Sequence, residues 1–124
     1  KLIVELNLTD SVIMPGFVSN PYPWYKGAKL FVLSSDSEGF GNVIVEALAC
    51  GLPVISTDCG PVQEILIGEL SQGITPKGNP VEMSDKINQY LLAPVLPNKE
   101  SIDMFSFEYT ISQQMGLIAD NAKV

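Results

Sequence analysis

The sequence predicts an α/β fold, doubly wound around a mostly parallel sheet with flanking helices. Two observations support this fold class. Short, continuous apolar runs, typical of strands that are buried on both faces, alternate along the chain with longer segments of helical spacing. Glycine and proline residues punctuate the boundaries between them. Strand–helix alternation of this kind favours a parallel sheet, and 124 residues of which 46% are hydrophobic can enclose one core.

The apolar runs and the turn residues give each element its expected bounds. Apolar residues in Lys1 to Leu8 predict the end of a helix, and Asn20-Pro21 suits the first turn of another. Gly51 and Pro53 predict the end of the helix that starts near Asn42. We expect strands at 12–14, 30–33, 54–55 and 73–75, and further helices at 42–50, 80–92 and 106–120.

The charge balance excludes several functional classes. The net charge is −7, and the seven basic residues are all lysines, with no arginine and no histidine in the sequence. A nucleic-acid partner is therefore not expected, because phosphate backbones require clustered positive charge. The usual general base for acyl transfer and the commonest metal ligand are missing as well. No apolar run approaches the roughly 20 residues that a membrane span needs.

The two cysteines do not form a recognisable functional pair. Cys50 and Cys59 are nine positions apart, which fits neither a CxxC redox motif nor a zinc site. We expect both to be free thiols in a reducing cytoplasm.

The stretch from Ser37 to Asp58 carries most of the functional information. Gly39 and Gly41 allow a close approach of the backbone to a ligand, and the helix that follows offers free N–H groups to an anion. Glu38 and Glu46 flank this loop with seven residues between them. Glycine turns between strands and helices are common, and a single glutamate is usually only solvated. The ordered combination, however, suits a phosphate-bearing sugar, with donors for phosphates and carboxylates for hydroxyls.

This combination resembles the signature of glycosyltransferase family 4, the group 1 glycosyltransferases. The resemblance covers roughly residues 10 to 112. The motif consists of Glu38, Gly39-Phe40-Gly41, Glu46, the run Ala47 to Val54, Ser56-Thr57-Asp58 and Glu64-Ile65, preceded by Gly16-Phe17-Val18 and Leu30 to Ser34.

The resemblance implies the GT-B fold, which has two Rossmann-like domains with the active site between them. Residues 1–124 would then be a partial nucleotide-sugar-binding, C-terminal domain of a retaining glycosyltransferase that needs no metal. Its partners would be a nucleotide-sugar donor and a glycan, lipid or other acceptor. The acceptor domain and the basic pair that neutralises the diphosphate would lie outside this chain. Alone, the chain would therefore bind donor weakly and transfer nothing. The expected location is the cytoplasm or the cytoplasmic face of a membrane, which the other domain would contact.

The resemblance also assigns roles to individual residues at three loops that would meet beyond the carboxyl ends of the strands, 15–20, 34–41 and 56–61. Glu38 would be the catalytic residue that contacts the donor sugar, and Glu46 would bind the ribose. The other assignments are Phe40 and Gly41 to the sugar site, the N–H groups of Gly41, Asn42 and Val43 to the phosphates, and Val18 and Ser19 to the base.

Other interpretations of the same residues stay open. Asp36-Ser37-Glu38 could suggest an Asp-x-Asp metal motif, but no second acidic cluster supports it. Structural roles are favoured for Asp58 and Cys59, and the aromatic residues that follow Pro21 are expected to pack a helix on the sheet. A nucleotide-sugar epimerase of the same fold and a non-catalytic nucleotide-sugar-binding module are the alternative functions. An apolar stripe of Phe107, Ile111, Met115 and Ile118 predicts self-association of the chain.

Overall fold

The computed structural model describes residues 1–103 of the chain. The helix expected at 106–120, and with it the apolar stripe that predicts self-association, lies outside the described residues.

A parallel sheet of three strands forms the centre of the structure. Its strands are β1 (Phe31–Leu33), β2 (Val54–Thr57) and β3 (Ile74–Thr75), in the order β1-β2-β3. Val32 pairs with Ile55, and Thr57 pairs with Thr75. Every residue of β2 is buried, as expected for a strand that has a neighbour on each side and helices on each face. The α/β fold with a parallel, Rossmann-like sheet is therefore confirmed.

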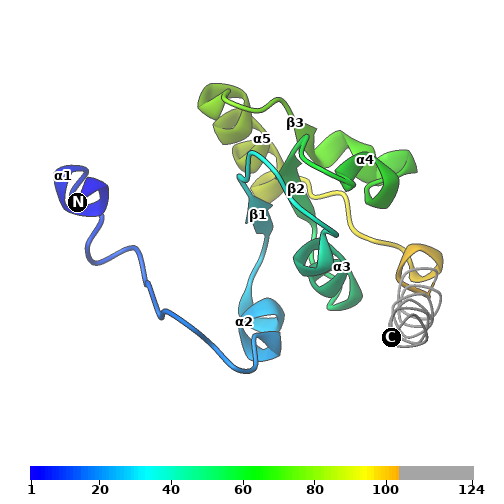
Figure 1. The fold of residues 1–124 in the computed structure, drawn as a ribbon, viewed down its shortest axis with the longest axis horizontal. Coiled ribbons are helices and arrows are strands. Elements are labelled where there is room, and N and C mark those ends of the chain that lie inside the picture. Colours follow the sequence, from blue (N-terminus) through cyan, green and yellow to red (C-terminus); the bar gives the residue numbers. More distant parts are fainter. Residues whose placement is uncertain (104–124) are drawn as a thin grey trace, which may run out of the picture.

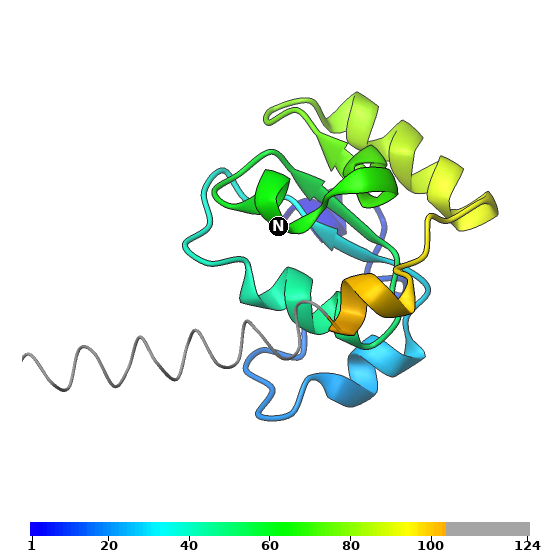
Figure 2. The ribbon, with the colours of Figure 1, turned by 90° about the vertical axis from the view of Figure 1, so that its right-hand side faces the viewer.

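Helices cover both faces of this sheet. Helix α3 (Asn42–Ala49) contacts β1 and β2, and helix α5 (Pro80–Leu92) contacts β2 and β3. Figures 1 and 2 show the two helices on opposite faces, which is the doubly wound arrangement. The short helix α4 (Val62–Ile65) and the 3-10 helix η1 (Gly68–Gly73) connect β2 to β3. Within residues 1–103, no helix is both long enough and apolar enough to cross a membrane.

The core lies between α3 and β2 and extends to α4. Ile44 and Leu48 of α3 pack with Val54 of β2 and with Val62, and each of these four is at most 2% exposed. Burial of one such aliphatic side chain contributes about 1.5–3 kcal/mol to folding. Both cysteines are free thiols, as expected from their spacing, and Cys59 is fully buried.

Local sequence signals fix the ends of the two long helices. Asn79 caps α5, because its Oδ1 accepts the N–H of Glu82 at 3.1 Å while its Nδ2 donates to the Glu82 carboxylate at 3.1 Å. Gly51 has a φ of 79° just after α3, as its position in the sequence predicts. Both helices agree with the expected bounds, 42–50 and 80–92. Tyr90 is the one buried residue of helix α5, and its neighbour Leu91 is 54% exposed.

The strand expected at 12–14 is absent, and this prediction was wrong. Helix α1 (Leu2–Glu5) leads into an arm that runs apart from the sheet to helix α2 (Tyr22–Gly27) (Figure 1). Ile13 and Met14 are 75% and 78% exposed on this arm. A strand requires a neighbour that pairs with its N–H and C=O groups. In a doubly wound sheet the corresponding strand is separated from β1 by other strands, and residues 1–103 supply none there.

The close contact between η1 and β2 gives a test of this packing. A Cβ on Gly73 would lie 2.2 Å from the carbonyl oxygen of Val54, so Gly73→Ala must displace the backbone of the central strand. We expect a loss of about 1–3 kcal/mol in the free energy of unfolding, measured by urea denaturation. Gly27→Ala is the matched control, because a Cβ there would meet nothing within 4 Å. Equal unfolding free energies of the two variants would show that Gly73 does not pack closely against the carbonyl oxygen of Val54.

Candidate functional site

The loop between β1 and α3 builds an anion-compatible helix start. Gly41 is the N-cap of α3, with φ 67° and ψ 25°, a left-handed conformation that glycine adopts without strain. Its carbonyl oxygen accepts the N–H groups of Ile44 at 3.0 Å and Val45 at 3.2 Å. The N–H groups of Asn42 and Val43 precede these first helical bonds, so they have no acceptor within the helix. They form the part of the loop that is suited to a phosphate.

Glu38 is held from two directions. The hydroxyl of Ser35 donates a hydrogen bond to Oε1 of Glu38 at 3.1 Å, which orients the carboxylate. From the other side, Gly60 packs directly against the Glu38 backbone, since a Cβ on Gly60 would lie 2.1 Å from its carbonyl oxygen. The loops that leave β1 and β2 therefore touch at Glu38, and only glycine fits the second of them here.

Thr57, the last residue of β2, makes the second connection between these loops. Its hydroxyl lies within hydrogen-bond distance of the carbonyl oxygens of Ser35 and Leu33 and of the sulfur of Cys59. A threonine hydroxyl has one proton to donate, and the carbonyl of Ser35 is the closest acceptor. Thr57 is 6% exposed, so water does not compete for this bond. Ser35 thus receives a bond from Thr57 on its backbone and gives one to Glu38 from its side chain.

Glu46 lies one turn into α3 and also accepts a hydroxyl. The phenol of Tyr25, on α2, donates a hydrogen bond to Oε2 of Glu46 at 3.0 Å. A phenol keeps its proton at neutral pH, and burial and this bond to the carboxylate raise the pKa of Tyr25 further, to about 12. Tyr25 also packs edge-on against Phe31, with ring centroids 5.9 Å apart, so the expected packing of α2 on the sheet is observed for Tyr25. Tyr22 and Trp24 are 51% and 50% exposed, and for them this prediction was wrong.

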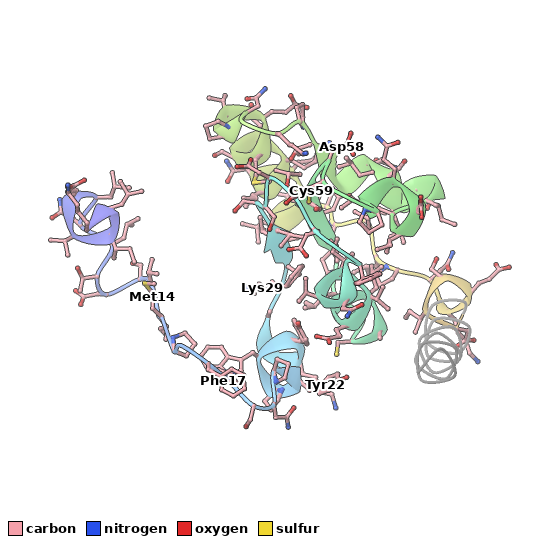
Figure 3. The ribbon with its side chains drawn as sticks, viewed as in Figure 1. Met14, Phe17, Tyr22, Lys29, Asp58 and Cys59 are labelled. Carbon is pink, nitrogen blue, oxygen red and sulfur yellow. The ribbon has the colours of Figure 1, made fainter. Side chains whose placement is uncertain are left out.

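The structure brings together most, but not all, of the expected site residues. Glu38, Gly41 and their neighbours share one loop, in which Phe40 is 69% exposed. Val18 and Ser19 lie elsewhere, on the segment that precedes α2. Figure 3 shows Phe17 of this segment below the sheet, at the opposite end from Asp58. The expected meeting of three loops is therefore observed for 34–41 and 56–61 and not for 15–20, because the strand that would have carried 15–20 to the same edge does not form.

A small cavity opens beside these loops at the carboxyl ends of the strands. Its volume is about 220 Å³, and its walls combine four polar residues with apolar ones from the start of α5. The lining residues are Ser34, Asp36, Thr57, Pro76, Gly78, Asn79, Pro80 and Met83. Among residues 1–103, no three His, Cys, Asp or Glu side chains gather as a metal-ligand set would.

The sequence gives no signal for the contacts that four residues make at the site. Tyr25 and Ser35 donate to the carboxylates, Thr57 donates to the carbonyl of Ser35, and Gly60 packs on the backbone of Glu38. Ser35, Thr57 and Gly60 follow strands and read as ordinary turn or strand residues. Tyr25 was assigned to packing alone. No spacing rule predicts that the Tyr25 hydroxyl reaches Glu46 or that the Thr57 hydroxyl reaches the carbonyl of Ser35, because each of these pairs comes from different elements. Ser35 and Glu38, by contrast, are three positions apart in one loop. Asp58 and Cys59 have the structural surroundings expected of them: Asp58 accepts a hydrogen bond from Gln63 at 2.8 Å, and Cys59 is buried.

The fold and the loop agree with the comparison with known families. Residues 1–103 match the family described as glycosyl transferases group 1. The chain belongs to this family.

Relatives and a solved structure show the same likeness. An uncharacterized glycosyltransferase of Methanocaldococcus jannaschii is 48% identical over 73 residues, 57% of this chain and 18% of that protein. The N-acetylgalactosamine-N,N'-diacetylbacillosaminyl-diphospho-undecaprenol 4-alpha-N-acetylgalactosaminyltransferase of Campylobacter jejuni is 46% identical over 57 residues, 46% of this chain and 16% of the relative. Sucrose-phosphate synthase from Thermosynechococcus elongatus superposes on 98% of this chain with a TM-score of 0.78 and 29% identity, over 32% of its own length. The chain thus spans less than a fifth of the length of the Methanocaldococcus and Campylobacter relatives.

The Thr57 hydroxyl offers a direct test of the loop connection. Thr57→Val keeps the shape of the side chain but leaves the carbonyl of Ser35 without its donor, so we expect a loss of about 1–3 kcal/mol in unfolding free energy. Amide exchange across residues 35–39 should accelerate. Thr75→Val is the control, because Thr75 is equally buried but its hydroxyl bond to Ser56 is long, at 3.4 Å. If Thr75→Val lowers the unfolding free energy by as much, the bond from Thr57 to Ser35 contributes no more to stability than the long bond of Thr75.

Proposed function

We propose that this chain is the donor-binding domain of a retaining glycosyltransferase, which moves a sugar from a nucleoside-diphosphate sugar to a glycan, lipid or other acceptor. The carrying observation is that one loop and helix start, 38–46, contains two carboxylates, each oriented by a hydroxyl donor, and two backbone N–H groups without an acceptor in the helix. Membership of the group 1 family supports the transferase class. The Campylobacter relative is named for a diphospho-undecaprenol acceptor, which supports a lipid-linked acceptor.

The proposed division of labour follows the chemistry of the donor. The N–H groups of Asn42 and Val43 bind the diphosphate, where the positive end of the α3 dipole favours negative charge. The Glu46 carboxylate accepts hydrogen bonds from the ribose hydroxyls, and the Glu38 carboxylate accepts them from the sugar. Phe40 and Gly41 shape the sugar site. Val18 and Ser19 would contact the base only if the segment 15–20 were carried to the same edge of the sheet, where residues 1–103 do not place it.

Retention and metal independence complete the proposal. The family resemblance implies that the anomeric configuration is kept and that the donor itself needs no metal. In this scheme the backbone N–H groups and the helix dipole are the chain's own contribution to neutralising the diphosphate, since the sequence contains no arginine. The remaining positive charge comes from residues outside this chain. The epimerase alternative has no observation in its favour, because the similar proteins named above are transferases or synthases.

The two glutamates can be separated by binding measurements. Glu46→Gln should weaken a nucleoside diphosphate about tenfold or more, because a charge-assisted bond contributes about 1.5–3 kcal/mol. Glu38→Gln should leave nucleoside diphosphate binding unchanged and weaken only the matching nucleotide sugar. Titration calorimetry of both ligands with both variants decides, with Glu82→Gln at the α5 cap as a control. Identical behaviour of the two variants would rule out distinct roles.

A second test concerns the chain on its own. Because the acceptor domain and the diphosphate-neutralising cations lie outside residues 1–124 in this proposal, the purified chain should bind donor in the millimolar range and transfer no sugar. A panel of uridine, guanosine and adenosine diphosphate sugars should be assayed for released nucleoside diphosphate. Turnover by the chain alone would overturn the division into two domains.

A further inference from the structure

The hydrogen bond between Tyr25 and Glu46 links two helices through the proposed ribose-binding carboxylate. Tyr25 belongs to α2 and Glu46 to α3, 21 positions later. The phenol oxygen lies 3.0 Å from Oε2 of Glu46, within the normal range for a bond to a carboxylate. The bond is partly buried, so it is shielded from competing water more than a surface pair would be. A group outside α3 therefore determines where this carboxylate points.

Tyr25 is itself fixed by packing. Its ring makes a T-shaped contact with Phe31, the first residue of β1, with centroids 5.9 Å apart and planes at 68°. On the other side it makes a T-shaped contact with Tyr22 at 6.2 Å and 76°. Such edge-to-face geometry is favourable and restricts the ring. Phe31 is in turn tied to the sheet, because its N–H donates to the carbonyl of Pro53 at 3.0 Å. The position of the Tyr25 hydroxyl is thus defined by the sheet.

The direction of this hydrogen bond is also defined. An ionised carboxylate has acceptors only, so the phenol must donate. A phenol is protonated throughout the neutral range at its ordinary pKa near 10, and burial first and then the bond to Glu46 raise the pKa of Tyr25 further. The bond uses one lone pair of Oε2. The second carboxylate oxygen and the other lone pair of Oε2 remain free to accept hydroxyl protons.

We propose that Tyr25 is a positioning residue for the ribose subsite: its phenol holds the Glu46 carboxylate in the orientation that accepts the two ribose hydroxyls. The inference rests on the proposed role of Glu46. A glutamate side chain that is already ordered loses less rotamer freedom when the ligand binds. The phenol therefore increases affinity for a ribonucleotide without contacting it, and it has no corresponding effect on a nucleotide that lacks the hydroxyls.

The experiment compares two tyrosine variants with two kinds of ligand. Tyr25→Phe keeps both ring contacts and removes only the donor, and Tyr22→Phe is the matched control on the same helix. The probes are uridine, guanosine and adenosine diphosphates and their 2′,3′-dideoxy counterparts, titrated into the chain and followed by NMR. We expect Tyr25→Phe to weaken the tightest ribonucleotide about fivefold and to leave its dideoxy counterpart unchanged. Tyr22→Phe should match the wild type for both.

Two further variants test the linkage through Glu46. In the Glu46→Gln background, adding Tyr25→Phe should cause little further loss, whereas a purely structural role would give additive losses. Glu46→Asp keeps the charge but withdraws the carboxylate by one methylene from the phenol. It should show a ribose-dependent loss from the ribose contact alone, and adding Tyr25→Phe to this variant should again cause little further loss if the phenol acts through the carboxylate.

The outcomes separate this inference from the proposed function. If Glu46→Gln weakens ribonucleotide binding while Tyr25→Phe binds like the wild type, the positioning role is wrong and the function stands. Equal losses of ribonucleotide and dideoxynucleotide in Tyr25→Phe would also overturn it, because the residue would then only support the fold. If Glu46→Gln binds every probe like the wild type, the proposed role of Glu46 fails and this inference fails with it.

Discussion

The hydroxyl of Thr57 joins the carboxyl end of β2 to the loop that leaves β1, and the functional edge of the sheet depends on this bond. Parallel pairing brings the two strand ends to one edge but leaves the loops beyond them without ladder partners. The hydroxyl of Thr57 donates to the carbonyl of Ser35, and the hydroxyl of Ser35 donates to the carboxylate of Glu38. The close approach of Gly60 to Glu38 completes the connection.

The two carboxylates of the candidate site follow one physical rule. Each accepts a hydroxyl proton: Glu38 from Ser35, three positions earlier in the same loop, and Glu46 from Tyr25 on another helix. A hydroxyl donor stabilises the charged form without adding a competing positive charge, so the remaining lone pairs stay available. This arrangement suits recognition of sugar hydroxyls in a chain with a net charge of −7 and no arginine. In the proposed function, anion binding then depends on the backbone N–H groups at the start of α3.

The N-terminal arm shows the limit of pattern-based prediction. Ile13 and Met14 have the apolar character of a buried strand, and yet both are largely exposed. Apolar residues favour burial of a segment. The segment forms a strand, however, only when a neighbouring strand pairs with its backbone N–H and C=O groups. In residues 1–103 the outer edge of β1 has no such neighbour, and the segment stays extended. The placement of Val18 and Ser19 follows from the same cause, since the loop that holds them is not carried to the functional edge.

The sequence by itself determined the α/β class, the strands 31–33, 54–57 and 74–75 to within two residues, and the bounds of α3 and α5. These depend on local signals: apolar runs, the Asn79 cap and the glycine after α3. It also determined the motif from Glu38 to Glu46 that marks the family. Only the tertiary structure decided which groups orient the two carboxylates and that the segment 12–14 remains unpaired. The orientation of Glu46 and the connection between the two loops depend on contacts between residues about 20 or more positions apart, Tyr25 with Glu46 and Thr57 with Ser35, and no local pattern encodes such distances.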